Sequence, residues 1–260
     1  MRSKEKGQMA KMKTVEEALL VVKKNGEMLE RIPEALRTYE VCLAAVQDFG
    51  NAIEYVPELL ITEELCFATV QNAPGNGLGD ALLTKLPKKM ITEALCLVAV
   101  SNLGSALQFV PEKFKTAEVC LTAVKNASKN GNSIGIHPSS GSVLKYVPKK
   151  HLTYELCLAA VKSYSDLINL VPKSFFTEEL WIEAVKQSWY RIHDVPKELL
   201  TNNVWFEAVK QNWNLLGIVP EKMKTLELCL IAAKQSGYAL NYVPESLKDE
   251  VKAQRSKKKK

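Results

Sequence analysis

Six cysteines are the residues of this sequence with the most varied chemistry, because thiolates bind metal ions, attack electrophiles and form disulfides. Zinc sites usually pair two cysteines as Cys-x-x-Cys, and no such pair occurs here. The cysteines instead recur at intervals of 24 residues or more. This spacing indicates a repeated structural position and predicts neither a metal site nor a redox site. The six are Cys42, Cys66, Cys96, Cys120, Cys157 and Cys229.

Other signatures of catalysis are weak. His137, His151 and His193 belong to no His-Glu-x-x-His motif. The segment PGNGLGD, residues 74–80, has loop glycines but lacks the Gly-Lys-Ser/Thr that contacts phosphate and magnesium in nucleotide sites. We therefore predict a protein that is not an enzyme, with no catalytic residues and no cofactor. A module that assists a catalytic chain is a further alternative.

A repeat organises the whole chain and accounts for the cysteine spacing. When each repeat is numbered from a threonine at position 0, a proline follows at position 19 in seven repeats and later in two repeats that carry insertions. The basic period is 24 residues, and the insertions add 6 and 13 residues. The nine repeats begin at Thr14, Thr38, Thr62, Thr92, Thr116, Thr153, Thr177, Thr201 and Thr225.

The repeat that begins at Thr38 shows what each unit should form. The threonine can cap a helix, and the apolar residues at positions 3, 4, 7 and 8 line one helical face. A second short helix should contain Ala52 and Ile53 and end at Pro57, with residues 59–61 closing the unit over its neighbour. Because such short helices are marginal alone, each must pack on the next copy. The sequence predicts an all-α fold, an α-solenoid of nine short two-helix repeats.

Position 4 of the repeat explains the cysteines. All six occupy it, and Trp181 and Trp205 fill it in the seventh and eighth repeats. Packed helices lie about 8–10 Å apart, beyond the roughly 7 Å that a disulfide bridges between two Cα atoms. We therefore expect buried free thiols rather than a ladder of disulfides.

The pattern Thr-x-Glu-Leu-Cys-Leu-x-Ala-Val, followed by an apolar pair and Val-Pro-Glu or Val-Pro-Lys, resembles the repeat of a bacterial family known as domain of unknown function 4116. The similarity covers about residues 14–247 and is clearest in residues 38–57, 92–111, 153–172 and 225–244. The resemblance implies tandem helical repeats. It implies no activity and no functional residues.

The net charge of +6 resides in the two ends of the chain. Residues 1–13 carry +4 and residues 248–260 carry +5, so the repeats, residues 14–247, carry −3. We predict a basic flexible tail at each end of the repeat domain. No stretch is apolar enough for a membrane span, and the N-terminal residues lack a secretory signal, so we expect a cytoplasmic location.

Both insertions fall between the two helices of a repeat, at residues 74–80 and 129–142, and should emerge at the same edge. The longer one is polar, and its Asn132 and His137 are candidates for contact with a partner. The alternative is a surface insertion with no function, which loops tolerate at little energetic cost.

A second departure from the repeat is aromatic. The seventh and eighth repeats place large rings near positions 12 and 13, where other repeats have glycine or small polar residues. Trp, Tyr and Arg dominate the energetic centres of protein interfaces. The alternative is that the rings pack on Trp181 and Trp205 and widen the core locally. The candidate partner-binding residues are Trp189, Tyr190, Arg191, His193 and Trp213.

The third departure is a lysine ridge after the Val-Pro step of the middle repeats. A continuous basic stripe can follow a phosphate backbone. The alternative is a solvated face with salt bridges, because Glu112 and Glu198 interrupt the ridge and the repeats are net negative. The candidate polyanion-binding residues are Lys88, Lys89, Lys113, Lys115, Lys149, Lys150, Lys173 and Lys197.

Together these observations predict a non-enzymatic helical-repeat scaffold that binds a protein partner through the insertions and the aromatic patch. The alternative function is binding of nucleic acid or another polyanion through the lysine ridge and the basic tails, which salt should weaken steeply.

Overall fold

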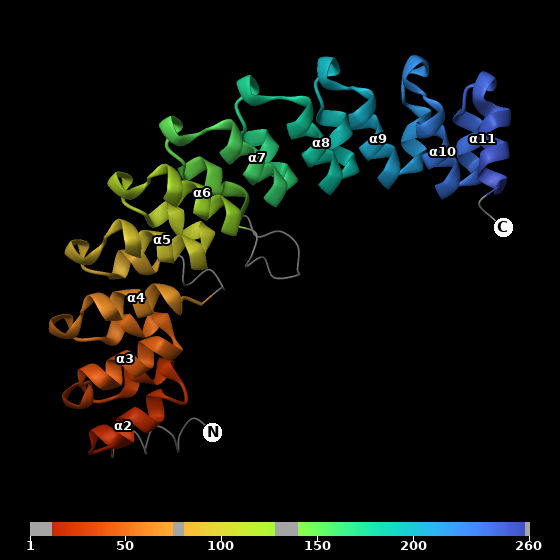
Figure 1. Cartoon of the computed structure of the whole chain (residues 1–260). Coiled ribbons are helices and arrows are strands. Elements are labelled where there is room, and N and C mark those ends of the chain that lie inside the picture. The colour runs from red at the N-terminus through yellow and green to blue at the C-terminus, as the bar shows by residue number, and fades with distance from the viewer. Residues whose placement is uncertain (1–11, 75–80, 128–139, 258–260) are drawn as a thin grey trace. The chain divides into compact units, whose positions relative to one another are not determined.

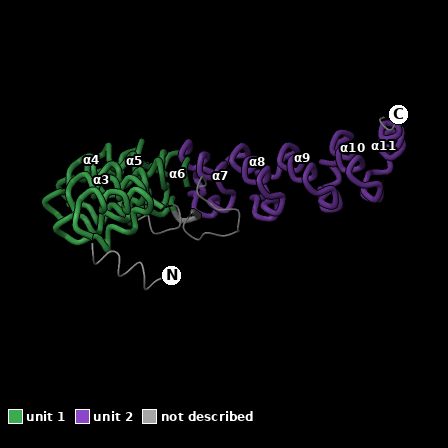
Figure 2. The backbone as a smooth tube through the Cα atoms, turned by 90° about the horizontal axis from the view of Figure 1, so that it is seen from below, with its two compact units in different colours: residues 1–153 green, residues 154–260 purple. Residues whose placement is uncertain are grey.

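The computed structural model describes residues 12–74, 81–127 and 140–257. The chain divides into two compact units (Figure 2), unit 1 at residues 1–153 and unit 2 at residues 154–260. Each unit is a stack of helical repeats, and the described residues contain no strand. The expected all-α repeat architecture is confirmed.

Each repeat begins with an α-helix of eight to ten residues directly after its threonine. The cap forms as the sequence predicts: the Thr177 hydroxyl oxygen accepts a hydrogen bond from the Leu180 N–H at 3.2 Å. The same bond recurs at seven other repeat threonines. The α-helices of unit 1 are α2 (Val15–Val22), α3 (Tyr39–Asp48), α4 (Glu63–Gln71), α5 (Glu93–Asn102) and α6 (Ala117–Asn126), and those of unit 2 are α7 (Tyr154–Ser163), α8 (Glu178–Gln187), α9 (Asn202–Gln211) and α10 (Leu226–Gln235).

The predicted second short helix of each repeat is present and is a 3₁₀-helix. In this segment the pre-proline residue cannot continue a helix; Val56 is extended, at φ −79° and ψ 128°. The short run that remains suits the tighter 3₁₀ geometry. These helices are η1 (Gly26–Arg31), η3 (Gly50–Tyr55), η5 (Leu82–Lys85), η7 (Gly104–Phe109) and η9 (Ser140–Tyr146) in unit 1, and η11 (Ser165–Leu170), η13 (Trp189–Asp194), η15 (Trp213–Gly217) and η17 (Gly237–Tyr242) in unit 2.

A further single 3₁₀ turn follows the proline of each repeat up to the eighth. In the second repeat the Leu60 N–H donates to the Pro57 carbonyl at 2.9 Å. The turn holds its middle residue away from the core: Leu59 is fully exposed, so the prediction that it closes the repeat is wrong. The turns are η2 (Glu34–Leu36), η4 (Glu58–Leu60), η6 (Lys88–Met90), η8 (Glu112–Phe114), η10 (Lys149–His151), η12 (Lys173–Phe175), η14 (Lys197–Leu199) and η16 (Glu221–Met223).

The order of elements gives every repeat two distinct edges. The proline turn directly precedes the next threonine cap, so it lies where the α-helices begin; we call this the turn edge. The residues between an α-helix and its 3₁₀-helix lie where the α-helices end, about 15 Å away for ten residues; we call this the junction edge. Within each unit successive α-helices pack side by side in chain order (Figure 1).

The core lies between successive repeats, at the positions that the sequence indicates. In the second repeat Val41, Cys42, Ala45 and Val46 are fully buried, and Ala52 of the 3₁₀-helix joins them. The residues at positions 3, 4, 7 and 8 are also buried in the third to ninth repeats, whereas in the first repeat only Ala18 and Val22, at positions 4 and 8, are buried. Each short helix therefore gains its stability from the neighbouring copy rather than from its own length.

The C-terminal end differs from the flexible tail expected for residues 248–260. Residues Glu245–Lys257 form one helix, α11, which packs on α10. Val251 is fully buried and the Arg255 guanidinium lies against Gly237. The segment is polar because α11 covers the last repeat with one face and leaves the other in solvent. Of the expected N-terminal tail, residues 1–11 lie outside the described residues.

Side chains at position 10 join successive repeats. The Gln211 Nε2 donates to the Val185 carbonyl of the preceding repeat at 2.6 Å, and its Oε1 accepts from the Trp189 N–H at 3.2 Å. Gln187 makes the same two bonds to Val161 and Ser165. One amide thus satisfies a carbonyl near the end of an α-helix and an N–H at the start of a 3₁₀-helix.

Glycines at position 12 allow a closer version of this junction in unit 1. A Cβ atom on Gly26, Gly50 or Gly104 would lie 2.3 Å from a backbone carbonyl oxygen of the next α-helix. The 3₁₀-helix therefore approaches its neighbour by main chain alone. In the first pair of repeats the Gly26 N–H donates to the shorter Asp48 side chain at 2.7 Å.

We expect Gly104→Ala to lower the free energy of unfolding by about 1–3 kcal/mol, because the new methyl overlaps the Ala123 carbonyl. Gly217→Ala is the matched control, since its methyl would meet only the movable Tyr242 ring at 3.2 Å. Urea unfolding followed by circular dichroism measures both. Equal stability of the two variants would contradict the tight junction.

We also expect Gln211→Ala to destabilise the chain by about 1–3 kcal/mol, because the Val185 carbonyl and the Trp189 N–H both lose a partner. Lys210→Ala, one residue earlier and exposed, should change the free energy of unfolding by less than about 0.5 kcal/mol. Thermal and urea unfolding compare the two variants. A neutral Gln211→Ala would show that the amide does not hold the repeats together.

Candidate functional site

The candidate aromatic residues lie at the junction edge of unit 2. Trp189 and Tyr190 begin η13, their rings meet edge to face at 5.6 Å between centroids, and Tyr190 meets the His193 ring at 5.3 Å. Tyr190 is 64% exposed, His193 is exposed and Trp189 is half-buried. Trp213 begins η15 in the next repeat and is also half-buried. The structure therefore brings three of these rings into one cluster and holds them at the surface.

Arg191 belongs to the frame of this cluster. Its guanidinium forms ion pairs with Asp166 of the preceding repeat and with Asp194, the latter at 2.9 Å, and its side chain is only 16% exposed. The Arg191 charge is thus neutralised by two carboxylates. The sequence could not indicate this, because Asp166 is 25 residues away along the chain.

Further exposed aromatic residues extend the cluster along unit 2. Tyr164 in the sixth repeat and Tyr238 in the ninth are 39% and 73% exposed. Hydrogen bonding to Asp166 raises the pKa of the Tyr164 hydroxyl. Tyr164 escapes a search of positions 12 and 13 because it occupies position 11, whereas Tyr238 shares position 13 with Tyr190 and was within reach of that search. We call Tyr164, Trp189, Tyr190, Trp213 and Tyr238 the aromatic row.

Trp181 and Trp205 are separate from the aromatic row. Both are buried in the core at position 4, and Phe176 packs edge to face on Trp181 with centroids 5.2 Å apart. The indole Nε1 atoms of both tryptophans are buried without a hydrogen-bond partner. They fill the slot that cysteine occupies elsewhere, as the sequence predicts.

The lysine ridge lies on the turn edge. Seven of its eight lysines are exposed on the proline turns, and no ion pair involves these seven within the described residues. The exception is Lys115, which pairs with Glu112 at 3.3 Å and is 12% exposed. Lys113 lies 4.5 Å from the centroid of the Phe114 ring. The five ridge lysines of unit 1 that stay exposed are Lys88, Lys89, Lys113, Lys149 and Lys150, and those of unit 2 are Lys173 and Lys197.

Asn132 and His137, the candidates in the longer insertion, lie outside the described residues, as does most of the shorter insertion. Residues 131–135 also match the pattern Gly-x-Ser-x-Gly. In hydrolases that pattern presents a nucleophile at a sharp turn between a strand and a helix. The part of the chain that the structure describes has no strand, so this context is not found there.

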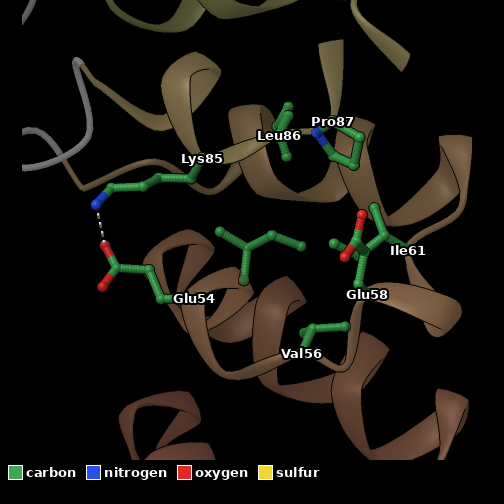
Figure 3. Close-up of a pocket in the computed structure, with 8 residues that line it drawn as sticks. Glu54, Val56, Glu58, Ile61, Lys85, Leu86 and Pro87 are labelled. Carbon is green, nitrogen blue, oxygen red and sulfur yellow. Dashed lines mark ion pairs between the residues drawn. The ribbon is translucent and has the colours of Figure 1, made fainter. Parts of the chain in front are cut away.

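A surface groove of about 480 Å³ lies between the second and third repeats of unit 1. The side chains of Glu54 and Lys85 point toward one another across it and pair at 3.4 Å (Figure 3). Val56, Ile61 and Leu86 form its apolar wall. The groove is a seam between repeats that is bridged by an ion pair.

Two glutamates at position 2 of the repeat, Glu64 and Glu179, bond to a tyrosine of the preceding repeat. The Tyr154 hydroxyl donates to Glu179 of the next repeat at 2.7 Å, and Tyr39 donates to Glu64 in the same way. This bond to Glu64 raises the pKa of the Tyr39 hydroxyl. These bonds tie repeats together at the turn edge.

The cysteines are buried and unpaired, as predicted. Burial raises the pKa of the Cys42, Cys96, Cys120 and Cys157 thiols from 9.0 to about 11. Such thiols remain protonated at neutral pH and are poor nucleophiles. Among the described residues no group of three or more His, Cys, Asp or Glu side chains is placed to hold a metal ion.

We expect the native thiols to react with a thiol reagent only as fast as the chain opens, and all six to react at once in denaturant. Rapid labelling of most thiols in the native protein would show that position 4 is not core.

Because the folded pKa is raised, the stability that these thiols contribute is fully present below pH 9 and is lost as pH rises to about 11. Urea unfolding at several pH values from 9 to about 11 should show this decline in the free energy of unfolding, and the decline should be smaller for Cys96→Ala.

The comparisons with known proteins agree with the repeat architecture. A family model described as domain of unknown function (DUF4116) matches residues 16–61 and 203–248, which fall in the first two and the last two repeats. Neither the curated proteins nor the solved structures gave a match. None of the described helices is both long and apolar enough to cross a membrane. The resemblance seen in the repeats is thus confirmed at two places, residues 16–61 and 203–248, where the chain matches the DUF4116 family model.

Proposed function

We propose that this chain is a non-enzymatic scaffold that binds a protein partner through the junction edge of unit 2. The observation that carries the proposal is the aromatic row: four consecutive repeats each place a ring at this edge, and Tyr190 and Tyr238 are 64% and 73% exposed. Exposed rings that recur on one edge are typical of an interaction surface, whereas scattered apolar residues are normal on any surface.

The geometry of the row suits binding. Trp189, Tyr190 and His193 already pack against one another, so little side-chain freedom remains to be lost when a partner arrives. Arg191 fixes η13 to the preceding repeat through Asp166. The rings therefore project from a rigid support.

The insertions are included in the proposal as further contacts. Each separates an α-helix from its 3₁₀-helix, so each starts from the junction edge of unit 1. Asn132 and His137 belong to the longer one. A cytosolic, bacterial setting is also proposed; a reducing compartment suits six unpaired cysteines.

Binding of a polyanion is a second candidate function, favoured by one observation. The seven exposed lysines of the ridge lie on the turn edge, at the same step of successive repeats, without ion-pair partners among the described residues. Such cations can neutralise successive phosphates. Glu112 and Glu198, on the same turns, oppose this function.

The test is capture of partners from native lysate by the immobilised full chain, with and without nuclease and at low and high salt. We expect retained proteins that resist nuclease and high salt, because an interface centred on aromatic rings depends little on counterion release. Tyr190→Ala combined with Tyr238→Ala should abolish their capture.

Leu59→Ala is the control variant, because it removes an exposed apolar side chain from the turn edge of unit 1. It should leave capture unchanged. Recovery of nucleic acid alone, only at low salt and lost when Lys149 and Lys150 are replaced by glutamine, would refute the protein-binding function and favour the polyanion alternative.

A further inference from the structure

The charges along the junction edge of unit 2 are arranged with free cations at the two ends. Position 9 is lysine in all four α-helices of the repeats there: Lys162, Lys186, Lys210 and Lys234. The two inner lysines pair with glutamates one turn earlier, Lys186 with Glu183 at 2.8 Å and Lys210 with Glu207 at 3.6 Å.

The two outer lysines have no such partner. One turn before them stand Ala159 and Ile231 in place of glutamate. Lys162 and Lys234 are both exposed, and neither forms an ion pair within the described residues. The ends of the edge therefore carry uncompensated positive charge.

The centre of the edge is apolar and electrically balanced. It contains Trp189, Tyr190 and Trp213 of the aromatic row, of which Tyr190 is 64% exposed. The one arginine, Arg191, is balanced by its two aspartates. A ligand that complements this edge has an apolar centre and an acidic group at each end.

The length of that ligand follows from the stack. From α7 to α10 there are three steps between packed helices, each about 8–10 Å, so Lys162 and Lys234 are separated by about 27 Å. An extended peptide rises about 3.3 Å per residue. Two carboxylates about eight residues apart therefore match the two free lysines.

A single-stranded nucleic acid fits this edge less well. The position-9 lysines, Arg191 and Arg255 beside Gly237 give six positive charges, and Glu183, Glu207, Asp166 and Asp194 give four negative charges. A strand with one phosphate per nucleotide requires a row of free cations, and here only the two ends are free.

The glutamine side chains of the edge are occupied by hydrogen bonds within the stack. Gln187 donates to one backbone carbonyl and Gln211 to two, and each accepts from one N–H. These amides are therefore not available to form hydrogen bonds with the backbone of a peptide. Rings and lysines remain as the recognition elements.

We propose that the junction edge of unit 2 binds an extended peptide segment of about ten residues, with apolar side chains in the centre and a carboxylate near each end. This inference rests on the proposed function and specifies its partner. The rings bury the apolar centre, and Lys162 and Lys234 select the acidic ends.

The test is fluorescence anisotropy of the full chain with a labelled peptide pool of about twelve residues, two fixed glutamates about eight residues apart and a centre drawn from Leu, Phe, Tyr and Pro. We expect this pool to bind at least about tenfold more tightly than the same pool with lysine in place of glutamate. Tyr190→Ala should weaken binding by about tenfold or more, in the range of an interface centre.

Lys162→Gln combined with Lys234→Gln should weaken binding about threefold to tenfold, the range of two exposed ion pairs. Lys173→Gln combined with Lys197→Gln is the matched control, because it removes the same charge from the turn edge of the same unit. It should leave affinity unchanged.

If the two double variants lose affinity for the glutamate pool equally, the effect is one of net charge alone and the inference is overturned. Tighter binding of an oligothymidylate of similar length than of the glutamate pool would overturn it in favour of a polyanion. If the glutamate pool shows no preference while Tyr190→Ala with Tyr238→Ala still abolishes protein capture, the peptide inference fails and the proposed function stands.

Discussion

The hydrogen bonds between successive repeats are the constraint on which the stack depends. An α-helix ends with carbonyls that have no partner in the helix, and a 3₁₀-helix begins with free N–H groups. In this chain both kinds of group meet at each junction. Gln187 and Gln211 satisfy one of each with a single amide from the next repeat. The repeats are therefore joined through main-chain groups that would otherwise be costly to bury.

The side chains at positions 10 and 12 vary together. Gly26, Gly50 and Gly104 precede repeats with Asp48, Asn72 and Asn126 at position 10, whereas Trp189 and Trp213 precede repeats with Gln211 and Gln235. Glycine permits a main-chain approach that no Cβ could tolerate, and a short side chain is sufficient there. Any side chain at position 12, that of Ser165 as well as those of Trp189 and Trp213, needs more space, which glutamine, longer by one methylene, can span. Where that side chain is a ring, it becomes part of the aromatic row.

Most of the fold follows from the sequence because it is encoded once per repeat. Threonine caps, the buried stripe and the proline stop each recur often enough to be identified without a structure. Local geometry was harder to predict: the proline leaves too short a run for an α-helix, and the single turn after it directs Leu59 outward. The polar segment after Leu247 also looked like a tail, because one buried valine, Val251, is a weak signal for a helix that covers the last repeat.

The candidate site was only partly visible in the sequence. Trp189, Tyr190 and Trp213 stand out because they replace small residues at positions 12 and 13. Tyr164 lies one position earlier, at 11, and only Tyr238, at position 13, could have been found by the same search. The partners of charged groups depend on which residues the stack brings together, as with Arg191 and Asp166.

The two edges of a repeat are under different physical constraints, and this separates fold from function. At the turn edge proline fixes the backbone, so the first two residues that follow can be glutamate or lysine without affecting the core. At the junction edge the residues at positions 10 and 12 hold the stack together, and only those beside them can vary freely. The lysine at position 9 of the repeat and the rings at positions 11–13 lie beside this junction. A change in their chemistry therefore alters what the edge binds while the hydrogen bonds that define the repeat remain, and because each repeat contacts only its neighbours, one repeat can change without the others.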